Sequence, residues 1–142
     1  MKGFVFHAVF EPGDKKGIVV SFPDVPEAIT QGANEADAYA TAEEALGLAL
    51  LSYVVRGLSL PKPKARGGVP VAVAADVAAK LAVLQAFREA GISKAELARR
   101  LDKDEKEVRR ILDPRHPTKL PTLTETLRAL GKRLVVAVEK AA

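Results

Sequence analysis

Cationic side chains gather in the segment between residues 92 and 112. Lys106, Arg109 and Arg110 recur there at helical spacing, and guanidinium groups can pair with guanine bases or with phosphate oxygens. Apolar residues occupy the opposite side of the same segment, as in a helix with one buried face. The pattern predicts a surface for a polyanion, and an ordinary solvated helix face is the alternative.

Two helix-start signals position these cations. Ser93 is followed three residues later by Glu96, and Asp104 is followed at the same spacing by Glu107. A short polar residue three positions before a glutamate is typical of a helix N-terminus. Because only residues 102–103 separate the two helices, they must cross steeply. The segment therefore predicts a helix-turn-helix, whose second helix enters the major groove of DNA.

We expect DNA contacts from the start of the first helix, from the second helix and from the loop that follows it. The candidate DNA-binding residues are Ser93, Lys94, Lys103, Glu105, Lys106, Arg109, Arg110, Arg115 and Lys119. Glu105 is included because a carboxylate can accept a hydrogen bond from the amino group of cytosine. The alternative for Glu105 is a helix-capping residue that stays away from DNA.

The composition narrows the possible classes of protein. A chain of 142 residues is long enough for one ordinary domain or two small ones. It has no cysteine, so it has neither a disulfide framework nor a thiolate metal site, and its two histidines lie far apart. There is no apolar run of about 18 residues and no signal-peptide pattern. We therefore expect a cytoplasmic protein with no membrane association, no bound metal and no cofactor.

The charge is unevenly distributed. Residues 1–60 carry four Lys and Arg against eight Asp and Glu, whereas residues 61–142 carry eighteen against ten. An acidic first part and a basic second part predict two modules with different partners, the second of them polyanionic.

The first part predicts a small mixed module. Strands are expected at residues 2–10, 17–22 and 28–31, followed by a helix from residue 34 or 35 to about 56 and a last strand at 69–74. Residues 59–70 are rich in proline and glycine and are either an interdomain linker or, as we favour, a loop before that last strand. The predicted domains are therefore residues 1–75 and 76–142.

The second part predicts four helices and one strand. Asp76 and the pair Thr122 and Glu125 are further helix-start signals, and residues 132–139 alternate like a strand. A single strand in a helical domain has no sheet to join, so a second copy of the chain would have to pair with it. The alternatives are a continued helix or a frayed end. The candidate dimerisation residues are Leu134, Val135, Val136, Ala137 and Val138.

Residues 21–32, SFPDVPEAITQG, resemble the signature of HicB-like antitoxins, in which a strand ends in Phe-Pro-Asp and a short apolar strand ends near a glycine. A helix with Glu44-Ala45-Leu46 follows, and the resemblance covers residues 2–74. The later segment is similar to the lambda-repressor-like class of helix-turn-helix. One departure is Glu27, where the family often has glycine. The resemblance implies that the β-β-β-α-β module is a worn-down RNase H-like fold and that a helix-turn-helix domain follows it. With the C-terminal dimerisation strand expected from the residues, the predicted class is α+β.

The resemblance also implies a function: an antitoxin that covers a small HicA-like, RNA-cleaving toxin and represses its own operon by binding operator DNA. Covering the toxin is physically reasonable because an acidic module attracts the basic surface that holds RNA. The candidate toxin-binding residues are Phe22, Pro23, Asp24 and Val25, although Phe22 has a core role as its alternative.

Two other functions are alternatives for this chain. One is a stand-alone transcription regulator whose first module binds a ligand or oligomerises. The other is a residual nuclease, which we do not expect, because the acidic residues lie mostly in turns rather than converging on strand ends. We therefore expect no catalytic residues.

Overall fold

The computed structural model describes residues 3–141 of the chain, which form two compact units divided after Ala78. The first unit contains a four-stranded antiparallel sheet, and the chain has five helices within the described residues. The predicted α+β class is confirmed. An RNase H-like ancestry of the first unit, and a separate function for each part of the chain, stay predictions.

The sheet is built from β1 (Val5–Pro12), β2 (Ile18–Ser21), β3 (Thr30–Gly32) and β4 (Val69–Ala72), in the order β3-β2-β1-β4. Every neighbouring pair is antiparallel. The predicted β-β-β-α-β order is confirmed, with strand ends displaced by a few residues.

The third strand begins later than predicted. The Ala28 backbone N–H donates to the Val25 carbonyl oxygen, so residue 28 belongs to the turn before β3 rather than to the strand.

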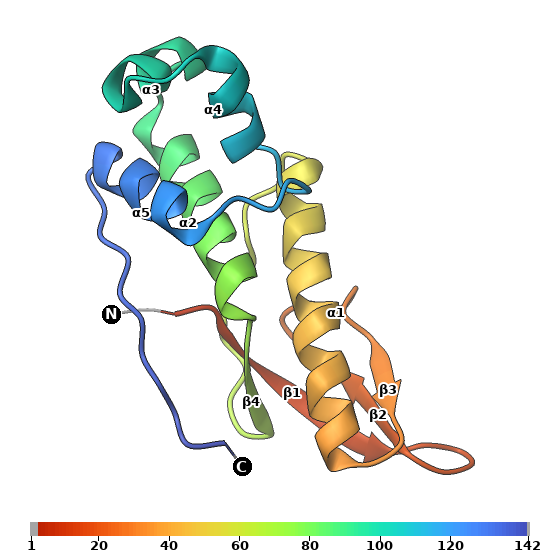
Figure 1. The fold of residues 1–142 in the computed structure, drawn as a ribbon. Helices are drawn as coiled ribbons and strands as arrows, with labels where there is room; N and C mark the ends of the chain where they lie inside the picture. Colours follow the sequence, from red (N-terminus) through yellow and green to blue (C-terminus); the bar gives the residue numbers. More distant parts are fainter. Residues whose placement is uncertain (1–2, 142) are drawn as a thin grey trace. The chain divides into compact units, whose positions relative to one another are not determined.

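Helix α1 (Glu35–Val55) lies across one face of this sheet (Figure 1). It begins where predicted, because the Asn34 side chain accepts a hydrogen bond from the Asp37 backbone N–H. Close packing at its start requires Gly32, since a Cβ atom there would overlap the backbone nitrogen of Ala38. The buried face of α1 consists of Ala38, Ala42, Leu46, Gly47, Ala49 and Leu50.

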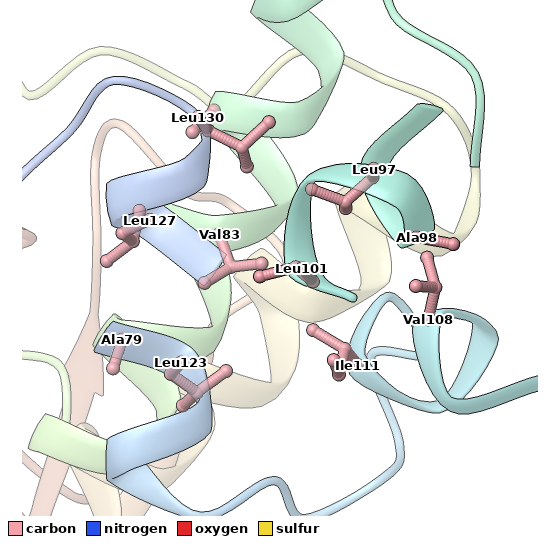
Figure 2. Packing of buried hydrophobic residues seen from close by; sticks show 11 residues of the cluster. Ala79, Val83, Leu97, Ala98, Leu101, Val108, Ile111, Leu123, Leu127 and Leu130 are labelled. Carbon is pink, nitrogen blue, oxygen red and sulfur yellow. The ribbon is translucent and has the colours of Figure 1, made fainter. Parts of the chain in front are cut away.

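The second unit has a hydrophobic cluster shared by four helices (Figure 2). These are α2 (Ala75–Ala90), which begins in the first unit, α3 (Lys94–Leu101), α4 (Glu105–Ile111) and α5 (Leu120–Ala129). The predicted starts of α3 and α4 are confirmed, with Ser93 and Asp104 as the N-cap residues. The cluster consists of Ala79, Val83, Ala86, Leu97, Ala98, Leu101, Val108, Ile111, Leu123, Leu127 and Leu130.

Two predicted helix starts are wrong. Helix α5 begins before Thr122, with Lys119 at the N-cap and no side-chain capping bond. Pro121 explains the earlier start, because proline has no N–H to satisfy and its fixed φ suits the first turn of a helix. Helix α2 begins at Ala75, which places Asp76 in its first turn rather than at its cap.

The predicted C-terminal strand is absent from the single chain: residues 132–141 have no regular secondary structure. All four strands in the described residues belong to the first unit, so the second unit offers this segment no strand to pair with. Val135, Val136 and Val138 are exposed. No helix within residues 3–141 is both long and apolar enough to cross a bilayer.

Candidate functional site

Helix α4 presents its cations to solvent. Val108 and Ile111 are buried in the hydrophobic cluster, whereas Lys106, Arg109 and Arg110 are exposed. Within residues 3–141, none of these three cations forms an ion pair. Their charges are therefore available to a partner.

The charged side chains of α3 are largely paired with one another, unlike the cations of α4. The Ser93 hydroxyl accepts from the Glu96 backbone N–H at 3.0 Å. The Glu96 carboxylate pairs with Arg99 and Arg100, and these hydrogen bonds lower the pKa of Glu96. Arg100 also donates to the Ala129 carbonyl oxygen at 3.2 Å, which ties α3 to the end of α5. Arg99, Arg100 and Lys94 are all exposed, but the two arginines are paired with Glu96 whereas Lys94 forms no ion pair within residues 3–141.

The turn between α3 and α4 is tight because Asp102 adopts a left-handed conformation, with φ of 54°. The Lys103 backbone N–H donates to the Ala98 carbonyl oxygen at 3.0 Å and closes the turn. The Asp104 carboxylate caps α4 by accepting from the Glu107 N–H at 2.8 Å. Glu105 is exposed, one residue further along.

The structure brings several of the predicted DNA-binding residues together around a shallow hollow of about 250 Å³. Its wall carries four basic side chains, from the α3–α4 turn, from α4 and from the loop before α5. His116 joins the predicted residues here, although the sequence alone leaves it an ordinary surface histidine. The hollow is lined by Lys103, Glu107, Arg110, Ile111, His116, Pro117, Thr118, Lys119 and Thr122. Arg115 is exposed in the same loop.

Lys80 supports this region from inside and was missed by the sequence reasoning. Its side chain is only 4% exposed, and its Nζ donates to the Ile111 carbonyl oxygen at 2.7 Å and to the Thr118 hydroxyl at 2.6 Å. It therefore links the C-terminal end of α4 to the loop before α5. Burial lowers the pKa of Lys80 to about 8, against the opposing charge of Asp113. A lysine within an apolar helical run was the available signal.

The predicted toxin-binding residues of the first unit are mostly occupied within the fold. Phe22 is 1% exposed and Val25 is fully buried, so the expectation that their side chains meet a partner is corrected. The Asp24 carboxylate accepts from the backbone N–H groups of Lys64 and Ala65, at 2.9 and 2.7 Å. Only Pro23 is fully at the surface. This motif anchors the loop before β4.

Glu27, the departure from the family pattern, is bonded to α1. Its carboxylate accepts from the Tyr53 hydroxyl, with oxygen–oxygen distances of 2.9 and 2.8 Å. This hydrogen bond lowers the pKa of Glu27 and raises the pKa of Tyr53. Within residues 3–141, no group of three or more acidic or histidine side chains is arranged to hold a metal ion.

Lys80→Met should change how stability depends on pH. In the wild type, the folded state releases the Lys80 proton near pH 8, whereas the unfolded chain holds it to about pH 10.5. The unfolded state binds more protons in this window, so the free energy of unfolding should rise with pH, by at most about 1.4 kcal/mol per pH unit.

The free energy of unfolding of wild type and Lys80→Met is measured by urea unfolding at pH 7, 8, 9 and 10. The difference between the two proteins at each pH isolates the contribution of Lys80, because the titration of other groups cancels. Lys80→Arg is the matched control because it keeps a charge that does not titrate here. An identical pH dependence in wild type and Lys80→Met would contradict the burial argument.

The comparison with known proteins covers both units. No protein-family model matches the chain. Antitoxin HicB 1 of Photorhabdus laumondii is 36% identical over 98% of this chain and 90% of its own length. Antitoxin HicB 2 of that organism is 40% identical over 85% and 87%, and antitoxin HicB of Escherichia coli K12 is 37% identical over 87% and 91%. Identity at this level over nearly the whole length confirms the expected resemblance: the chain belongs to the HicB antitoxin family.

Proposed function

We propose that this protein is an antitoxin that covers a HicA-like, RNA-cleaving toxin and represses its own operon by binding promoter DNA. The observation that carries the proposal is the near-full-length identity to proteins named as antitoxins, which includes both the acidic first part and the cationic second part. A stand-alone regulator whose first module binds a ligand or oligomerises is the alternative.

The negative charge of the first part of the chain supports a role in neutralising a toxin. An enzyme that cleaves RNA must hold phosphate groups, so its active surface is basic. Residues 1–60 of this chain carry an excess of four acidic residues. Opposite charges accelerate association and fix orientation, which suits an inhibitor that must capture its toxin quickly.

The second unit supports the DNA-binding role. In a helix-turn-helix, the second helix lies in the major groove and the first helix crosses the backbone. Helix α4 has the unpaired cations for such a role, and the basic hollow beside it suits a flanking phosphate. Ser93 and Lys94 at the start of α3 suit another.

A palindromic operator would require a dimer, with half-sites about 34–36 Å apart. We propose that residues 134–138 provide it by pairing with the same segment of a second copy. The exposed valines of this segment and its unpaired backbone support this assembly. A higher homo-oligomer would be built from such two-fold symmetric dimers.

Co-expression tests the antitoxin proposal directly. A toxin-sized reading frame beside this gene, inactivated by mutation to avoid killing the host, is expressed with a tagged copy of this protein. We expect a stable complex on size-exclusion chromatography and, with the active toxin, restored growth. Nuclease treatment of the lysate is the control for binding through DNA. Persistent absence of both complex and rescue would contradict the proposal and favour a stand-alone regulator.

Arg109→Ala tests the DNA-binding proposal. If Arg109 contacts a base, its loss should weaken operator binding by roughly 1–3 kcal/mol, measured by gel shift or fluorescence anisotropy at fixed salt. Arg128→Ala is the matched control, because it removes an equal charge from the exposed surface of α5. Equal losses from both variants would indicate a purely general charge effect, and an unchanged affinity would remove Arg109 from the contact surface.

Val136→Asp tests the dimer. Val136 is 70% exposed in the single chain, so a carboxylate there should leave the monomer folded but disfavour an apolar strand pair. Light scattering after size-exclusion chromatography should show a shift from dimer to monomer. Val55→Asp, at an exposed valine of α1, is the control. A dimer that survives Val136→Asp at low micromolar concentration would place the interface elsewhere.

A further inference from the structure

Helix α1 borders a second hollow, to which the proposed functions assign no role. It has a volume of about 380 Å³ and lies between α1 and the chain just after β4, entirely within the first unit. We call it the α1 groove. It is lined by Ala40, Glu43, Glu44, Gly47, Leu48, Leu51, Ala74, Asp76 and Val77.

The floor of the α1 groove is apolar, with Ala40, Leu48, Leu51 and Val77 among its lining residues. Gly47 lies beside Val77, and a Cβ atom at Gly47 would be in van der Waals contact with Cγ1 of Val77, at 3.4 Å. Leu48 beside it is 63% exposed. Together with Leu51 and Val77 it gives the hollow an apolar lining, and an apolar hollow with a few polar groups at its edge is typical of a binding site.

The rim of the α1 groove is acidic. Glu43, Glu44 and Asp76 line it, and no basic residue does. None of the three carboxylates forms an ion pair within the described residues, although Asp76 accepts a hydrogen bond from the Val77 backbone N–H at 2.9 Å. An apolar floor with an acidic rim suits a lysine or arginine side chain, whose methylene stem lies on apolar surface while its charge stays at the edge.

We infer that the α1 groove is the surface that receives the toxin, with a basic side chain of the toxin lying on Leu48 and Leu51 and its charge among Glu43, Glu44 and Asp76. The inference rests on the proposed antitoxin function and names its contact surface. It replaces the Phe-Pro-Asp turn, whose Phe22 and Val25 side chains are buried and whose Asp24 carboxylate is already bonded.

A second exposed apolar residue of the same unit provides the contrast. Ile29 is 67% exposed, close to the value for Leu48, but it does not line the groove. The nearby Glu27 carboxylate is engaged by the Tyr53 hydroxyl. Ile29 therefore has comparable exposure without the combination of apolar lining and acidic rim.

The test compares Leu48→Lys with Ile29→Lys in the full-length protein. Both add one positive charge to the first unit at nearly equal exposure, so any long-range repulsion of a basic toxin is matched. Binding to the inactivated toxin of the operon is measured by calorimetry or biolayer interferometry. Leu48→Lys should raise the Kd by roughly tenfold or more, whereas Ile29→Lys should change it by about threefold or less. Thermal unfolding should be alike in both variants.

The outcomes separate the two proposals. Failure of the wild-type protein to bind or neutralise the toxin would overturn the antitoxin function and this inference with it. Tight wild-type binding with equal Kd values for the two variants would overturn the α1 groove alone. A change of oligomeric state in Leu48→Lys without toxin would show that the groove joins copies of this chain, which also contradicts the inference.

Discussion

The second unit depends on one hydrophobic cluster, to which each of its helices contributes. Helix α4 has only seven residues, too few to be stable as an isolated helix in water. Burial of Val108 and Ile111 fixes the orientation of α4 about its own axis. Because Lys106, Arg109 and Arg110 lie on the other side of the helix, this orientation exposes them to solvent. The orientation of the cationic surface is therefore a consequence of apolar packing, and a change to the cluster would be felt at the surface.

One buried cation, Lys80, and one exposed cation, Arg100, secure helix ends around this cluster. Lys80 donates to the last carbonyl of α4, and Arg100 donates to the last carbonyl of α5. A helix C-terminus carries partial negative charge and unsatisfied carbonyl groups, so a cation there satisfies both. Lys80 and Arg100 therefore link helix ends within the unit, whereas Lys106, Arg109 and Arg110 form no ion pair within residues 3–141.

Sequence reasoning succeeded where a signal is local. Ser93, Asp104 and Asn34 each cap a helix through a bond to a backbone N–H three residues away, and such a bond needs no distant partner. Predictions from the sequence were wrong or incomplete where a competing signal or a residue distant in the chain determines the local structure. Pro121 favours an earlier start of α5 than Thr122. Likewise, Asp24 is bonded to the loop some forty residues later, which no local pattern around Phe-Pro-Asp reveals.

The sequence by itself determined the family, the strand and helix order, the starts of the helices that carry the cations, and the contrast in charge between the two parts. Tertiary structure alone decided which polar groups are free. Only the folded chain shows that Lys80 is buried and that Phe22 and Val25 belong to the core. It alone also shows that Gly47 and Leu48 line a groove. The physical reason is that exposure and pairing depend on contacts between residues far apart in the chain, which hydrophobic periodicity and capping motifs do not encode.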